Sequence, residues 1–168
     1  LSRDVNVSLY TPISKEELIN QAKTQPLISD PGTAMIYSNV NYSLLAYIIE
    51  SVSGQTYEEY VEDHIFKPLN MHSSNAVSSN SDLPEMAEGY FVENAELNKV
   101  SETIYDVSVF FGAGNIYSTT KDLYLLDRGL YEEKILSRES MEMMYENGYG
   151  WGVGELNGNK WVGHNGLL

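Results

Sequence analysis

The sequence has no cysteine among its 168 residues. This absence excludes disulfide bonds, a catalytic thiolate and any metal site built on cysteine. The sequence contains three histidines, and neither His64 nor His72 forms, with the other or with a carboxylate, a spacing typical of a metal site. We therefore expect no metal and no other cofactor.

Basic residues are scarce, with 10 Lys and Arg against 24 Asp and Glu, and the formal net charge is −14. Because no cluster of Lys and Arg exists to bind phosphates, nucleic acid and anionic membrane surfaces are not expected as partners. The longest apolar run, Leu44 to Ile49, has six residues, whereas a membrane-spanning helix needs roughly 20. No membrane span is predicted in this segment, and the sequence leaves the oligomeric state open.

The chain also lacks the features of a complete secreted precursor. It does not begin with Met, and its first residues have neither a basic start nor an apolar signal core. Its last residues stop within an expected strand. We therefore expect a segment of a longer protein that forms one partial domain over residues 1–168.

The strongest local pattern runs from Pro31 to Gly54. A Pro-Gly turn and a short apolar approach lead to Tyr37-Ser38-Asn39, and a periodic helix follows. This helix is predicted to bury one broad face and to end at Gly54 in a left-handed conformation. The predicted buried face comprises Tyr42, Leu44, Leu45, Ile48, Ile49 and Val52.

Capping patterns place the other helices. Ser14 with Glu17 opens a helix from Lys15 to about Ala22, and Thr56 with Glu59 opens one from Tyr57 to about Phe66, which Pro68 ends. A fourth helix is capped by Ser118 or Thr119, and a fifth follows Ser137 with Met141 and Met144 inward.

A two-residue turn, Asn157-Gly158, separates two strand-like runs near the C-terminus and predicts a β-hairpin. We therefore predict a mainly α fold with a C-terminal antiparallel β-hairpin, the helical region covering residues 12–146 and the hairpin region 148–168. Residues 72–106 carry no firm pattern, and their role is left open.

Tyr37, Ser38 and Asn39 permit two interpretations. In the structural one, Ser38 or Asn39 is a helix N-cap and Tyr37 packs on the first helical turn. In the functional one, exposed polar groups are held by a rigid helix, as in many sites. The Tyr-x-Asn pattern alone does not decide between them, because it recurs at Tyr145-Glu146-Asn147.

Four blocks in the same order decide for the functional interpretation. The pattern PGT-x-x-x-YSN-x-x-Y-x-LL-x-x-IIE-x-VSG is followed by GAGNIYSTTKDL (112–123), GYGWGV (148–153) and VGHNG (162–166). Together they resemble the penicillin-binding, class C β-lactamase-like serine hydrolases. The resemblance implies a partial copy of the α/β serine β-lactamase/DD-peptidase fold, and it implies export to the cell envelope or outside the cell.

The same resemblance assigns roles to individual residues. Tyr37 corresponds to the tyrosine that exchanges a proton with the catalytic serine, and Asn39 to the residue that bonds the substrate amide. His164 and Gly166 lie in the motif that binds substrate along a strand, and the N–H of Leu167 corresponds to an oxyanion donor. His164 stands where relatives carry either Lys or His, and His favours a peptidase or esterase over a potent β-lactamase.

The family's nucleophile lies in a Ser-x-x-Lys motif. The one match here is Ser118 to Lys121, which falls in a block whose family counterpart starts a structural helix, so Ser118 is predicted to be a cap. The family motif would lie upstream of Leu1, and the 168-residue chain is therefore predicted to be inactive by itself. The expected parent acts on D-Ala-D-Ala peptides, β-lactams or esters; the alternatives are a non-catalytic binding or scaffold domain of this fold and a fragment made for structure determination.

Overall fold

The computed structural model describes residues 12–79, 86–99 and 106–166. Residues 1–11, 80–85, 100–105 and 167–168 lie outside the described residues. The described elements are α1 (Lys15–Thr24), α2 (Asn39–Ser53), α3 (Tyr57–Val61), α4 (Lys67–Leu69), β1 (Asn75–Ala76), β2 (Tyr90–Glu93), β3 (Glu96–Lys99), β4 (Ile116–Tyr117), α5 (Thr120–Tyr131), α6 (Arg138–Glu146), β5 (Gly152–Leu156) and β6 (Asn159–Gly163).

Local capping determines where the helices begin. The side chains of Ser14 and Thr56 each accept a hydrogen bond from the backbone N–H of a glutamate three residues on. The carboxylate of that glutamate in turn accepts a hydrogen bond from the backbone N–H of the cap residue. Both predicted capping boxes are thus confirmed. Thr119, not Ser118, caps α5 by accepting from the Asp122 N–H at 3.2 Å, and Ser137 caps α6.

The prediction that Pro68 ends the third helix is wrong. The chain passes from α3 through a π-helical turn, Glu62–Phe66, directly into α4, and it stops at Asn70 in a left-handed conformation. Proline has no N–H and its ring crowds the carbonyl four residues earlier. The wider π-helical turn changes the hydrogen-bonding partners just before Pro68, which explains how the helix accommodates it.

The buried face of α2 differs in part from the prediction: Leu44 and Ile49 pack against the core as predicted, but other positions do not. Val40, Ser43, Ala46 and Tyr47 are the buried residues of this helix. By contrast Leu45, Ile48 and Val52 are exposed at 53%, 55% and 79% among the described residues. Because α2 is apolar on nearly every side, apolar periodicity alone could not identify which side faces the core. We call the residues Leu45, Ile48 and Val52 the exposed stripe of α2.

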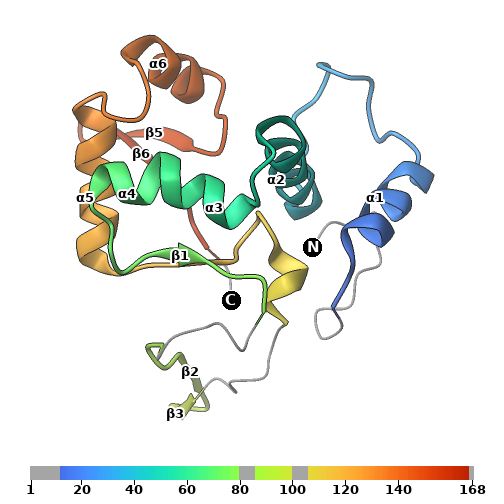
Figure 1. The fold of residues 1–168 in the computed structure, drawn as a ribbon. Coiled ribbons are helices and arrows are strands. Elements are labelled where there is room, and N and C mark those ends of the chain that lie inside the picture. The colour runs from blue at the N-terminus through green and yellow to red at the C-terminus, as the bar shows by residue number, and fades with distance from the viewer. Residues whose placement is uncertain (1–11, 80–85, 100–105, 167–168) are drawn as a thin grey trace.

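Two small clusters form the core. In one, α2 and the α3–α4 helix pack around Ala46, Val61, Phe66 and Leu69; in the other, Leu18 of α1 packs on Val40 and Tyr47. Phe111 joins them, since its ring stacks on Tyr47 at 4.9 Å between centroids and contacts Tyr57 edge-on at 5.4 Å. Helix α2 is therefore packed between α1 and α3, as Figure 1 shows.

The turn at residues 112–115 approaches the backbone of α2. Gly112 has φ +70°, and a Cβ built there would lie 2.5 Å from Ala46 Cβ and 2.9 Å from the Tyr42 carbonyl oxygen. The Gly112 N–H donates to the buried Asn115 side chain at 2.9 Å, and the Asn115 amide donates to the Val77 carbonyl at the same distance. This turn fixes the first half of α2 and thereby the site described below.

The strands form three antiparallel pairs within the described residues: β1 with β4, β2 with β3, and β5 with β6. The predicted C-terminal hairpin is confirmed, with Asn157 and Gly158 both at positive φ, as a two-residue hairpin turn requires. The β2–β3 hairpin, which extends away from the helices (Figure 1), was not predicted. No described helix has the length and apolarity needed to cross a membrane.

Candidate active site

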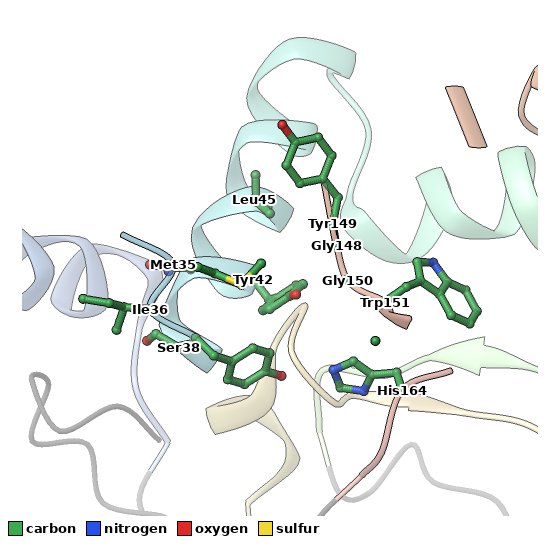
Figure 2. Close-up of a pocket in the computed structure, with 13 residues that line it drawn as sticks. Met35, Ile36, Ser38, Tyr42, Leu45, Gly148, Tyr149, Gly150, Trp151 and His164 are labelled. Atoms are coloured by element: carbon green, nitrogen blue, oxygen red, sulfur yellow. The ribbon is translucent and has the colours of Figure 1, made fainter. Parts of the chain in front are cut away.

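A pocket of about 640 Å³ lies between the N-terminal half of α2 and the C-terminal part of the chain (Figure 2). One wall comes from residues 35–45 and the other from residues 148–164. The lining residues are Met35, Ile36, Tyr37, Ser38, Asn41, Tyr42, Leu45, Gly148, Tyr149, Gly150, Trp151, Gly152 and His164.

Tyr37 and His164 meet in this pocket. Their rings are 6.0 Å apart between centroids, and the Tyr37 ring is 5.5 Å from that of Tyr42. Tyr37 lies one residue before the N-cap of α2, whereas His164 directly follows β6. Residues from nearly opposite ends of the described chain thus share one pocket, as the sequence predicted. Tyr37 is 59% exposed, so its hydroxyl is not committed to the core.

Ser38 occupies the N-cap position of α2, but its side chain makes no capping hydrogen bond. The structural interpretation of this residue therefore lacks the bond that would support it. Instead Ser38 lines the pocket. Its polar side chain, beside Tyr37, belongs to the pocket wall.

Two other predicted site residues, Asn39 and Gly166, are not among the lining residues of the pocket, and a third lies outside the described part of the chain. Asn39 is the first residue of α2 and is half-buried, with its carbonyl accepting from the Ser43 hydroxyl at 3.5 Å, but it is not among the lining residues. Gly166 is exposed, and a Cβ built there meets nothing within 4 Å. Leu167 lies outside the described residues.

The pocket wall carries no carboxylate, ammonium or guanidinium group among the described residues. Burial raises the pKa of Tyr42, and the neighbouring Tyr37 raises it further. Tyr42 therefore remains a neutral hydroxyl at neutral pH. A tyrosine acting as a base at that pH needs a nearby cation, and the described wall carries no Lys or Arg side chain.

Ser118 lies elsewhere. Its hydroxyl is 2.7 Å from that of Ser74, which donates to the buried Asp122 carboxylate at 2.8 Å. Asp122 also accepts from the Ser73 N–H at 2.8 Å. Ser118 thus helps join the start of α5 to the loop before β1 and is not among the residues lining the pocket. The cap is the neighbouring Thr119.

The sequence interpretation missed several wall residues. Tyr42 and Leu45 were predicted to face the core, whereas both line the pocket; Met35 and Ile36 were described only as an apolar approach. The signal for Tyr149 and Trp151 was present, since the GYGWGV block was recognised as a family motif. In the described part of the chain, no three His, Cys, Asp or Glu residues are grouped to hold a metal ion.

Comparison with known proteins gives consistent matches. A family model described as Beta-lactamase matches residues 2–168. The chain is 38% identical over 144 residues to a putative penicillin-binding protein, PbpX, of Bacillus subtilis (strain 168), covering 83% of this chain and 36% of that protein. It is 44% identical over 64 residues to a putative D-alanyl-D-alanine carboxypeptidase of Escherichia coli (strain K12), covering 38% of this chain and 14% of that protein.

Solved structures of related hydrolases and penicillin-binding proteins also match this chain. A D-stereospecific amidohydrolase from Streptomyces sp. matches 95% of this chain and 51% of its own, with 27% identity and a TM-score of 0.78. An octameric penicillin-binding protein homologue from Pyrococcus abyssi matches 94% of this chain and 39% of its own, with 29% identity and a TM-score of 0.70. The chain therefore adopts part of a fold shared with these proteins and spans at most about half of the length of these relatives.

Proposed function

Because the chain belongs to the beta-lactamase family, we propose that it is part of a serine hydrolase that transfers the acyl group of an amide or ester. The observation that carries this proposal is the approach of Tyr37 and His164 to 6.0 Å within one pocket. Two motifs that the family uses for catalysis and substrate binding thus meet where a substrate has room to bind.

In this proposal Tyr37 exchanges a proton with a nucleophilic serine, and His164 donates a hydrogen bond to the substrate or to Tyr37. The family resemblance assigns Asn39 to the substrate amide and Gly166 and Leu167 to the substrate-binding strand, although Asn39 and Gly166 are not among the residues that line the described pocket. Candidate substrates are D-Ala-D-Ala peptides, β-lactams and small esters. Location at the cell envelope or outside the cell is part of the same proposal and rests on family resemblance.

The proposal places the nucleophile outside these 168 residues. Ser38 is the serine of the described pocket wall, and no lysine lines that wall to activate it. Covalent catalysis requires an activated nucleophile, and in this family the nucleophile's own N–H supplies half of the oxyanion hole. The 168-residue chain alone is therefore proposed to be inactive.

The test uses two purified proteins, the 168-residue chain and the product of the complete open reading frame. Each is incubated with a labelled penicillin, and its intact mass is recorded. We expect one adduct on the longer protein, lost when the serine of an upstream Ser-x-x-Lys is replaced and retained in Ser118→Ala. An adduct on the 168-residue chain that Ser118→Ala abolishes would overturn the assignment.

The roles of the pocket residues are tested in the longer protein. Tyr37→Phe is expected to slow acylation by about 10² to 10⁴, the usual contribution of a proton-transferring group. Tyr124→Phe is the matched control, because Tyr124 is 62% exposed on α5 and does not line the pocket. Equal rates for the two variants would remove Tyr37 from the mechanism.

A non-catalytic binding domain is the second candidate, favoured by the absence of a lysine from the described pocket wall. It predicts that the complete open reading frame contains no Ser-x-x-Lys upstream and gains no adduct, although its pocket still binds a small molecule.

A further inference from the structure

The wall of the pocket is apolar and aromatic. Met35, Ile36 and Leu45 form one side, and Tyr149 and Trp151 contribute the other. In a chain with a formal charge of −14, no acidic or permanently basic side chain lines this pocket within the described residues. Such a wall offers a charged substituent hydrogen-bonding groups but no permanently charged partner, whereas it offers a large surface to an apolar substituent.

Several of these side chains are unusually exposed. Met35 is 78% exposed and Tyr149 60%. Apolar side chains gathered in a concave site are typical of a binding surface rather than of a random surface. Figure 2 shows that these side chains come from α2, from the loop before it and from the segment leading into β5.

The two walls approach each other at Gly148 and Gly150. Gly148 and Gly150 have φ of +64° and +75°, and a Cβ on them would lie 3.4 Å from Met35 Cε and 3.9 Å from the Tyr42 hydroxyl, respectively. The backbone of the second wall therefore runs directly opposite Met35 and Tyr42.

We infer that this pocket selects substrates with a large apolar, ring-bearing side chain next to the reacting carbonyl, such as a phenylalanine-type amide or ester, over those with an alanine methyl. This inference rests on the proposed function for the identity of the carbonyl. The size of the site agrees, because about 640 Å³ lies within the range of sites that hold whole small molecules, whereas a methyl group would leave most of the wall in contact with water.

The chain has its own reporter for the test, since Trp151 lines the pocket and Trp161 is the second of two tryptophans. In a Trp161→Phe background, Trp151 fluorescence is followed during titration with N-acetyl-D-phenylalaninamide or N-acetyl-D-alaninamide. These neutral ligands differ only in the side chain. We expect the phenylalanine compound to bind at least about tenfold more tightly, a modest discrimination for several added carbons in an open pocket.

Met35→Ala should remove most of that preference and leave the weak binding of the alanine compound unchanged. Met143→Ala is the control, because Met143 is 52% exposed on α6 and does not line the pocket. Equal affinities for the two ligands, no saturable signal with either, or equal effects of the two variants would each overturn the inference.

Equilibrium binding requires no nucleophile, so the outcome is separable from the acylation test. If penicillin acylates the longer protein but the two amides bind with equal affinity, the inference about the side chain is wrong and the proposed function stands. If the phenylalanine compound binds more tightly but no acylation occurs, the proposed hydrolase activity is contradicted instead. The pocket would then be a binding site for apolar amides.

Discussion

Gly112 is a position where the fold leaves no room for a side chain. It combines a left-handed backbone with a close approach to Ala46 and to the Tyr42 carbonyl of α2. Since Tyr42 lines the pocket, the separation at Gly112 determines where this part of the pocket wall lies. The glycine acts on the site through the backbone of α2, without contacting the pocket itself.

Gly112→Ala is expected to lower the free energy of unfolding by about 3 kcal/mol, because the added methyl overpacks against α2 and favours a right-handed backbone. Urea denaturation followed by circular dichroism measures the change. Gly114→Ala is the matched control in the same turn: its added Cβ would meet Phe110 at an ordinary 3.5 Å, so a loss below about 1 kcal/mol is expected. Equal losses would show that the turn relaxes freely.

At this scale the sequence predicted the polar members of the site better than the apolar ones. Tyr37 and His164 belong to motifs with recognisable chemistry, and the structure brings them together. Met35 and Leu45 could not be found in this way, because a pocket-lining apolar side chain looks like a core side chain in sequence. Only the three-dimensional neighbours distinguish the two.

Among the elements, α5 illustrates how a helix start is fixed from both sides. Thr119 caps it at its N-terminus. Asp122, in its first turn, accepts hydrogen bonds from Ser73 and Ser74, which lie in the loop before β1. The Asp122 side chain is buried, so these bonds satisfy a carboxylate that would otherwise be costly.

Thr119→Ala should cost about 1 kcal/mol of unfolding free energy, since it leaves the Asp122 N–H without its side-chain acceptor. Thr120→Ala, one residue on and also exposed, should change stability by less than about 0.5 kcal/mol. Thermal and urea unfolding of both variants provide the comparison. A larger effect at Thr120 would contradict the assignment of Thr119 as the cap.

Element boundaries were predicted well because they depend on nearby residues. The capping boxes, the left-handed Gly54 and the Asn157-Gly158 turn are each determined by a few neighbouring residues. The buried face of α2 and the continuation of the helix past Pro68 depend on partners far along the chain or on an altered hydrogen-bond register. No local pattern contains that information.

For the whole molecule, two features have opposite effects on self-association: the exposed stripe of α2 favours it, and the strong net charge opposes it. Leu45, Ile48 and Val52 offer a contiguous apolar edge, while a formal charge of −14 makes copies of the chain repel one another. The screening length falls from about 30 Å at 0.01 M salt to about 3 Å at 1 M. Salt should therefore promote association of this chain.

Sedimentation velocity at low and high salt is expected to show more association at high salt. Ile48→Lys with Val52→Lys should reduce it by placing charge on the stripe. The matched control is Leu123→Lys, because Leu123 is 53% exposed but lies on α5. Association that is unaffected by the Ile48 and Val52 changes would assign the contact to another surface.

The second wall of the pocket, residues 148–152 and His164, lies at the open end of the β5–β6 hairpin, and none of the hairpin's residues is buried. Units with little buried surface open at a lower free energy than the core. We expect the backbone amides of β5–β6 to exchange with solvent deuterium faster than those of Val40 to Tyr47 in α2, measured by hydrogen exchange and mass spectrometry. Equal protection would contradict this.

We expect opening of the hairpin to move His164, which directly follows β6, away from Tyr37, so that the assembled pocket is one population in an equilibrium. A molecule that binds only the closed form slows exchange by a factor of one plus the ratio of its free concentration to its dissociation constant, roughly elevenfold when that ratio is ten. N-acetyl-D-phenylalaninamide should thus protect amides along the hairpin that it never touches. A bound ligand would therefore stabilise the assembled pocket in addition to the contacts that the fold itself provides.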